Sequence, residues 1–366
     1  MIKIIDKYIF KQVLAASIAC LLLFIVVWIA PETLFKVIKR TLAGSYTPEI
    51  AIQLLVFEIP KILSKALPVG MLLGPLFVFD KLSKDFELTV MRGVGLSFWR
   101  ILTPVIVLSI FFTGFCFVVY DKWVPVSTTK LKELKREYGS SHFVHATNRP
   151  SGLPEQTVII SQYDKYHIRD LKVLNFADTE HEETSIIKSI MLADYANITD
   201  NGWDLKNVKK YNITKEGVFT NIENIDTVPI YDKQTSDKVF NLMVNSLKRD
   251  REFTNHELVS YIKLLKSEHL DEESNFMLNK YLQRYFHSLI CILFAILGCL
   301  LGFSQPREQR LIGFTIAIGI IFAYYITLPF FDLLAEKSIL PPLISASIQP
   351  ILITVFIFFM KKLKDL

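Results

Sequence analysis

The chain has 366 residues, of which 51% are hydrophobic and 21% charged, with a formal net charge of +5 at pH 7. Its mean hydropathy of +0.35 is higher than soluble globular chains ordinarily reach, so membrane spans are the first feature to look for. No nucleic-acid partner and no cofactor is expected.

Five segments lack Asp, Glu, Lys and Arg over about 20 residues, which is the length that a helix needs to cross a ~30 Å hydrocarbon core. These segments are residues 12–31, 101–120, 285–306, 311–331 and 338–360. A sixth segment, 51–79, is apolar apart from Glu58, Lys61 and Lys65. Their i, i+3, i+7 spacing places these charges on one helical face, where they can face a watery or protein-lined cavity. The sequence therefore predicts six spans, the second being one long helix with an amphipathic outer half.

With six spans, both termini lie on the same side of the membrane. Twelve Lys and Arg residues gather on that side, against four in the short loops opposite, so the positive-inside rule predicts cytoplasmic termini. The twelve are Lys3, Lys7, Lys11, Lys81, Lys84, Arg92, Arg100, Arg307, Arg310, Lys361, Lys362 and Lys364, and the four are Lys36, Lys39, Arg40 and Lys337.

The short loop after the second span is amphipathic, with apolar residues at 82, 86 and 90. This pattern predicts a helix over residues 80–92 that lies on the cytoplasmic face and is ended by Gly93 and Gly95.

Residues 121–284 form a polar segment between the third and fourth spans, predicted to lie outside. Four stretches rich in Val, Ile, Tyr and Phe indicate strands, and Asp200-Asn201-Gly202 is a hairpin signal. The flanks look helical, and Thr254 with Glu257 forms a capping box. The segment is therefore predicted to be an extramembrane all-β, jelly-roll-like domain with helical flanks.

The sequence has no phosphate-binding loop of the Gly-x-x-x-x-Gly-Lys-Ser/Thr type, no His-Glu-x-x-His, no Gly-x-Ser-x-Gly and no Cys/His metal cluster. We therefore predict a protein that is not an enzyme, without catalytic residues or a metal site. The informative polar residues are the cations at the outer membrane boundary: Lys36, Lys39, Arg40, Lys61, Lys65 and Arg284. They are either snorkelling side chains in a solvated loop or a cationic rim for a ligand that carries phosphates and long apolar chains.

Three motifs occur in a characteristic order: Ile5-Asp6-Lys7-Tyr8-Ile9 at the start, Leu67-Pro68 in the second span, and the run from Glu87 to Gly95, which has the form E-L-x-x-M-x-x-x-G. Because these motifs occur in this order within a six-span chain, the chain resembles the LptF/LptG permease family (YjgP/YjgQ-type), the membrane subunits of the bacterial lipopolysaccharide exporter. Both the F-like and the G-like member share this layout.

The resemblance implies a permease subunit of an ABC transporter, which extracts lipopolysaccharide from the inner membrane and passes it to a periplasmic bridge. It implies a cytoplasmic LptB-like ATPase dimer, the sister permease and an LptC-like subunit as partners. The implied organisation is residues 1–120 with three spans and a coupling helix near 80–94, residues 121–283 as the periplasmic domain, and residues 284–366 with three more spans.

The resemblance also implies site residues. The ATPase-coupling residues would be Glu87, Phe86, Leu88, Met91 and Arg92, and the substrate-headgroup residues would be Lys36, Lys39, Arg40, Lys61 and Lys65. Two other classes of function compete with this hypothesis. The chain could be a membrane-anchored scaffold or binding protein whose β domain docks a partner, although six spans are more than an anchor requires. A membrane enzyme acting on lipids is disfavoured, because no acid/base or nucleophile constellation converges.

Overall fold

The computed structural model describes residues 4–29, 33–44, 46–134, 143–148, 154–163, 168–177, 186–199, 202–214, 218–246, 248–303 and 311–364. The chain forms two compact units: a helical unit, residues 1–135 and 250–366, and a sheet unit, residues 136–249. The predicted turn residues Asp200 and Asn201, and the predicted cytoplasmic cations Lys3, Arg307 and Arg310, lie outside the described residues.

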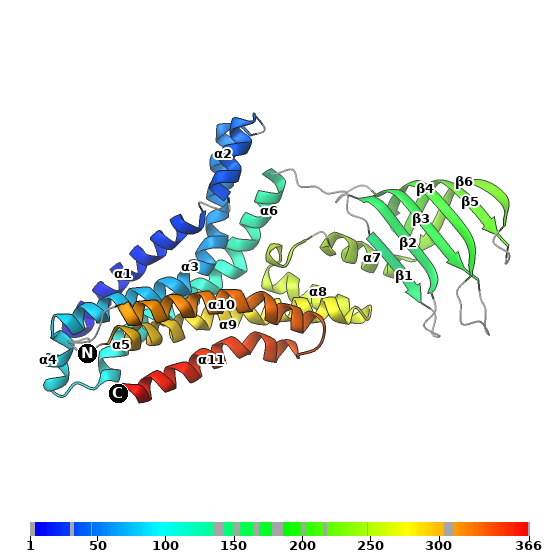
Figure 1. Cartoon of the computed structure of the whole chain (residues 1–366). Helices are drawn as coiled ribbons and strands as arrows, with labels where there is room; N and C mark the ends of the chain where they lie inside the picture. Colours follow the sequence, from blue (N-terminus) through cyan, green and yellow to red (C-terminus); the bar gives the residue numbers. More distant parts are fainter. Residues whose placement is uncertain are drawn as a thin grey trace. The chain divides into compact units, whose positions relative to one another are not determined.

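Six helices within the described ranges are long and apolar enough to cross a membrane, which confirms the multi-span helical architecture (Figure 1). They are α1 (Ile4–Ile29), α3 (Pro48–Lys84), the continuous helix of α5 (Phe98–Val118), η2 (Val119–Trp123) and α6 (Val124–Leu134), α9 (Asp271–Gly302), α10 (Leu311–Glu336) and α11 (Pro342–Leu363). The second span is a single 37-residue helix, α3. At 1.5 Å per residue it is about 55 Å long, so it extends roughly 25 Å beyond a ~30 Å hydrocarbon core.

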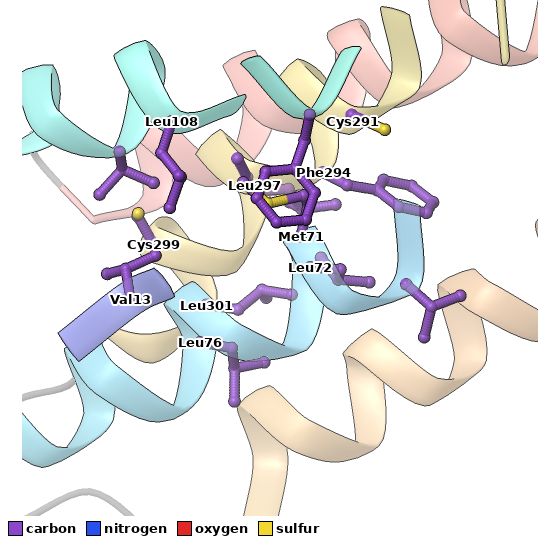
Figure 2. Close-up of a cluster of buried hydrophobic side chains, with 14 of the residues drawn as sticks. Val13, Met71, Leu72, Leu76, Leu108, Cys291, Phe294, Leu297, Cys299 and Leu301 are labelled. Atoms are coloured by element: carbon purple, nitrogen blue, oxygen red, sulfur yellow. The ribbon is translucent and has the colours of Figure 1, made fainter. Parts of the chain in front are cut away.

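The centre of the helical unit is α3, which packs between α1 and α9 (Figure 1). Small residues permit this close approach, as is common where membrane helices meet. A Cβ atom at Gly298 of α9 would stand 2.2 Å from the backbone oxygen of Leu72, and one at Gly74 would stand 2.2 Å from the Oγ of Ser17. Around these contacts, apolar side chains from α1, α3, α5 and α9 point toward one another (Figure 2).

The predicted single helix over residues 80–92 is broken in the structure. The helix α3 continues to Lys84, and α4 (Glu87–Gly93) begins after a turn at Asp85 and Phe86. Phe86 has a left-handed backbone conformation (φ 58°), which ends the first helix and changes the direction of the second. As predicted, the chain leaves the helix near Gly93 and Gly95, and Gly95 has a positive φ of 90°.

The predicted helical flanks of the polar segment belong to the helical unit. In α6, Leu131 is buried against Leu54 of α3 and Val37 of the short helix α2 (Phe35–Leu42). The capping box is confirmed at the start of α8 (Asn255–Ser267), where the Thr254 side chain accepts from the backbone of Glu257. These contacts keep the flanks against the spans.

The sheet unit contains a six-stranded antiparallel sheet whose strands are neighbours in chain order. The strands are β1 (Phe143–Asn148), β2 (Pro154–Tyr163), β3 (Ile168–Phe176), β4 (Ile187–Thr199), β5 (Gly202–Ile213) and β6 (Phe219–Tyr231). This confirms the predicted antiparallel β domain. The connectivity of the described strands is that of a meander, and the jelly-roll-like arrangement stays a prediction.

The core of the sheet unit lies on one face, which receives alternate residues of β2 to β5 and two side chains, Val239 and Met243, of α7 (Lys233–Ser246). Trp203 is fully buried there and its ring meets the ring of Tyr231 at 5.4 Å. The Tyr231 hydroxyl lies 3.2 Å from Nδ1 of His145, so a residue at the end of β6 contacts one in β1. Burial raises the pKa of the Tyr231 phenol above its ordinary value.

Candidate functional site

One end of the helical unit collects the beginnings and ends of several spans around α4 (Figure 1). We call it the α4 end. Arg100 at the start of α5 donates to Asp6 of α1 at 2.7 Å, and Tyr8 donates to Oε1 of Glu87 at 3.1 Å. Lys361 near the end of α11 lies 5.2 Å from the ring centre of Trp99. The first and last spans therefore have their chain ends at the same end of the bundle.

The five predicted coupling residues separate into two groups on α4. Leu88 is buried and Met91 packs against the same core, so both hold α4 to the bundle. Phe86 is exposed, Glu87 is half-buried beside Tyr8, and the Arg92 guanidinium lies over the Phe303 ring at 5.4 Å.

The exposed apolar face of this segment is made by Phe86, Val90 and Val94, which are 55%, 64% and 80% exposed. Val90 and Val94 were not among the predicted coupling residues, and Val94 lies beyond residue 92, where the predicted helix ended.

The predicted headgroup residues fall into three places. Lys36, Lys39 and Arg40 are exposed on α2, whose opposite face is held by the buried Val37. Arg40 donates to the Tyr46 hydroxyl at 2.6 Å.

On α3, Lys61 forms an ion pair with Glu58, which is only 4% exposed. Because a buried carboxylate needs a nearby counter-charge, this pair neutralises most of the charge of Lys61 locally. The Lys65 ammonium group lies 4.9 Å from the ring centre of Trp28, near the end of α1. The five predicted headgroup cations therefore do not form one cluster in the structure.

Lys65 also lines a cavity of about 270 Å³, which we call the polar cavity. Its walls come from α1, α3, η2, α6, η3 (Asp250–Glu252), α9, α10 and α11, so almost every long element of the helical unit contributes. Aromatic side chains supply much of the surface: Trp28, Tyr120, Phe286, Tyr324 and Tyr325. The polar cavity is therefore assembled only when the whole bundle is formed.

Two hydrogen-bond networks hold the cavity walls. Asp332 of α10 accepts from three residues of α9: it pairs with Lys280 and accepts from Asn279 at 2.9 Å and Gln283 at 2.7 Å. His287 contacts the hydroxyl of Tyr324 at 2.5 Å through Nδ1 and the backbone oxygen of Ser64 at 3.3 Å through Nε2. These bonds fix α3, α9 and α10 around the cavity.

Arg284, which the sequence placed at the head of the fourth span, is 6% exposed and lines the cavity. Its Nη1 donates to Oδ1 of Asn255 at 2.8 Å, and its Nη2 donates to the backbone oxygens of Asp250 and Phe253 at 2.8 and 3.0 Å. Asp121 of η2 accepts from the backbone N–H of Asn255 at 2.9 Å. The segment from η3 to the start of α8 is thereby tied to the spans.

Sequence reasoning did not predict Arg251 as a site residue, although it also lines the cavity. It follows the sheet unit in the chain, and only its position in the folded bundle brings it near Lys65 and Arg284. No group of three or more His, Cys, Asp or Glu residues that could hold a metal ion occurs in the described part of the chain.

These features define a multi-pass helical membrane protein with a β-sheet domain in the middle of the chain, a short exposed helix at one end of its bundle and a polar cavity within it. The family model of the lipopolysaccharide export system permease LptF/LptG matches residues 7–362. The chain belongs to this family.

Individual relatives are more distant. The lipopolysaccharide export system permease protein LptF of Escherichia coli (strain K12) is 22% identical over 231 residues, which cover 52% of this chain and 62% of the relative. The protein of the same name from Shigella flexneri has the same identity and coverage. The chain thus spans less than two thirds of the length of the curated relatives it matches.

Proposed function

We propose that this chain is one of the two permease subunits of an ABC transporter that extracts lipopolysaccharide from the inner membrane and passes it to a periplasmic bridge. The observation that carries the proposal is the family match over residues 7–362, because it includes both the helical unit and the sheet unit. The sequence has no phosphate-binding loop, so a separate cytoplasmic ATPase supplies the nucleotide chemistry.

In this proposal the α4 end is cytoplasmic and the sheet unit is periplasmic, with both termini in the cytoplasm. The support is charge, because the nine described cations of this set all belong to segments that begin, end or turn at the α4 end: Lys7, Lys11, Lys81, Lys84, Arg92, Arg100, Lys361, Lys362 and Lys364. Cytoplasmic loops and helix ends carry such an excess of Lys and Arg.

The exposed face of α4 is the docking site for an LptB-like ATPase dimer. Phe86, Val90 and Val94 would enter a groove of the ATPase, and Glu87 and Arg92 would contact its rim, as an amphipathic helix does in groove recognition. The sister permease and an LptC-like subunit complete the assembly.

The first contact with the substrate is assigned to Lys36, Lys39 and Arg40, since they are exposed cations on a helix held beside the spans. Lipopolysaccharide has phosphates at the membrane surface and acyl chains below it. A charge near a membrane surface contributes only about 1 kcal/mol, so single substitutions are expected to have small effects.

The triple substitution of Lys36, Lys39 and Arg40 by Glu should sharply reduce photocrosslinking and co-purification of lipopolysaccharide, while association with the ATPase is retained. The matched control replaces Lys238, Lys206 and Lys209 of the sheet unit by Glu. If the α2 triple variant captures lipopolysaccharide as the wild type does, the assignment of the substrate contact to α2 is wrong.

A further inference from the structure

The first two turns of α1 are tied to α4 and to α5 by polar contacts between residues far apart in the chain. Tyr8 donates to Oε1 of Glu87 at 3.1 Å, and Asp6 accepts from Nη2 of Arg100 at 2.7 Å. The side chain of Asp6 is 17% exposed, so this ion pair is partly shielded from water. The start of α1 is therefore bonded both to the short helix α4 and to the span that follows it.

The Tyr8 hydroxyl holds one oxygen of the Glu87 carboxylate. This hydroxyl is also hydrogen-bonded to the side chain of Gln12, one turn further along α1, so its own position is fixed. Among the described residues, no side chain other than Tyr8 forms a hydrogen bond with the Glu87 carboxylate, and Oε2 can accept from a donor on a partner. A glutamate side chain held in this way loses less rotamer freedom when a partner binds it.

The far end of the same helix reaches the polar cavity. At 1.5 Å per residue, Trp28 lies about 30 Å from Tyr8 along α1. Its ring lies 4.9 Å from the Lys65 ammonium group, and both residues line the cavity. One continuous helix thus connects α4 with a wall of the cavity.

Between these two ends, α1 is seated on α3 by close backbone contact. A Cβ atom at Gly74 would stand 2.2 Å from Oγ of Ser17, and one at Gly70 would stand 3.0 Å from the backbone oxygen of Ser17. Beyond Leu21, the side chains of Leu23 and Val26 are 67% and 68% exposed. Rigid helices in such contact are among the elements that can carry a displacement from one site to another.

We propose that Tyr8 is a positioning residue, which holds the Glu87 carboxylate in the orientation that the ATPase binds and passes a displacement of α4 to α1. Tyr8 acts through Glu87 and not by its own contact with nucleotide or lipopolysaccharide. The inference deepens the proposed function, and it rests on that proposal for the docking of the ATPase at α4.

The first test measures binding of the purified ATPase to the full-length chain, assembled with its sister permease in nanodiscs. Tyr8→Phe removes only a hydroxyl from a side chain that is 41% exposed, so it leaves no cavity in the core. It should weaken ATPase binding about three- to tenfold, the lower range for a hydrogen bond to a charged group. Wild-type affinity in this variant would overturn the proposal.

The matched control is Tyr281→Phe. The Tyr281 hydroxyl lies 2.9 Å from that of Tyr285, so this change also removes a hydrogen-bonded phenol. Tyr281 precedes Gly302 on α9, and Gly302 accepts from Ser83 at the α4 end. Along the helix Tyr281 is therefore about 32 Å from that end, and its loss should leave ATPase affinity unchanged. An equal loss in both variants would mean that removal of a tyrosine hydroxyl acts nonspecifically, and would overturn the proposal.

A double-mutant cycle separates positioning from a structural role of Tyr8. Glu87→Asp keeps the charge but shortens the side chain by one CH₂ group, which withdraws the carboxylate from Tyr8. It should weaken ATPase binding, and Tyr8→Phe added to it should cause no further loss, because the two residues act through one contact. Equal losses from Tyr8→Phe in the two backgrounds would show that Tyr8 does not act through Glu87.

The second test concerns the link from α4 to α1. In proteoliposomes with saturating ATPase and ATP, the lipopolysaccharide delivered to the LptC-like subunit is measured by photocrosslinking and divided by the ATP hydrolysed. This ratio should fall at least about twofold in Tyr8→Phe, since residues on such a path modulate coupling to about that extent. A wild-type ratio would overturn the passage of the displacement to α1.

Failure of this inference can be told from failure of the proposed docking site. If Glu87→Ala weakens ATPase binding and Tyr8→Phe does not, α4 is the docking site and the role of Tyr8 is wrong. If Glu87→Ala itself binds the ATPase as the wild type does, docking at α4 is wrong, and the positioning role of Tyr8 fails with it.

Discussion

Replacing Gly298 by Ala tests the packing of α3 against α9. The added Cβ would stand 2.2 Å from the backbone oxygen of Leu72, 3.1 Å from the Leu72 carbonyl carbon and 3.3 Å from the Leu76 nitrogen. These are backbone atoms of a helix, so no side chain can rotate away. To restore an ordinary contact the two helices must separate by about 1 Å, which disturbs a core packed at near-crystal density.

Overpacking of this kind costs about 1–3 kcal/mol. A Gly→Ala change in a helix also carries a gain of up to about 1 kcal/mol in helix propensity, which must be subtracted. Gly319→Ala in α10 is the matched control, because a Cβ there meets no atom within 4 Å. It should show the propensity gain alone.

The measurement is unfolding of the purified protein in detergent, followed by fluorescence and by loss of the monodisperse peak in gel filtration. We expect Gly298→Ala to unfold at a lower temperature than the wild type, and Gly319→Ala to unfold at the same temperature or a higher one. Equal unfolding of the two variants would refute the argument that α3 and α9 meet backbone to backbone at this position.

Three further predictions concern the α4 end, the orientation and the sheet unit. Glu87→Ala should weaken association with the ATPase, since loss of one partner of a charge pair commonly costs about 2–5 kcal/mol. A pull-down of the ATPase compares this variant with the control Thr89→Ala. Unchanged binding in Glu87→Ala would count against docking at α4. Reporters fused after residue 366 and inserted near Lys84 should both read cytoplasmic, and one in the turn between β4 and β5 should read external; opposite readings for the first two would mean an odd number of spans. Because burial raises the pKa of Tyr231 above its unfolded value of about 10, its contribution to stability is complete below pH 10 and is lost as the pH rises through the folded pKa. Tyr231→Phe should therefore make alkaline unfolding of the protein less steep, and an identical profile would contradict the burial argument.

Several features of this protein follow from short stretches of sequence. The six spans do, because an apolar run of about 20 residues has no stable alternative to crossing the membrane as a helix. The capping box at Thr254 and Glu257 does as well, since its four residues satisfy each other's backbone groups without help from the rest of the fold. The alternating strands also follow, because a period of two is a property of the strand itself.

Other features were decided by the tertiary structure. Lys61 and Lys65 have similar sequence surroundings, yet one is neutralised by Glu58 and the other lies against Trp28 in a cavity. The left-handed turn at Phe86 separates the buried Leu82 from the exposed Val90 and Val94, although an uninterrupted helix satisfied the same hydrophobic pattern.

The polar cavity is the clearest case. Lys65, Arg251 and Arg284 come from three elements, α3, η3 and α9; the whole sheet unit lies between the first two in the chain, and α8 lies between the last two. In the sequence, each of these cations by itself is typical of a charged residue at the membrane boundary. They converge because of the way the helices pack. Small residues such as Gly298 allow two helix backbones to come close together, and this approach brings side chains together that are far apart in the chain.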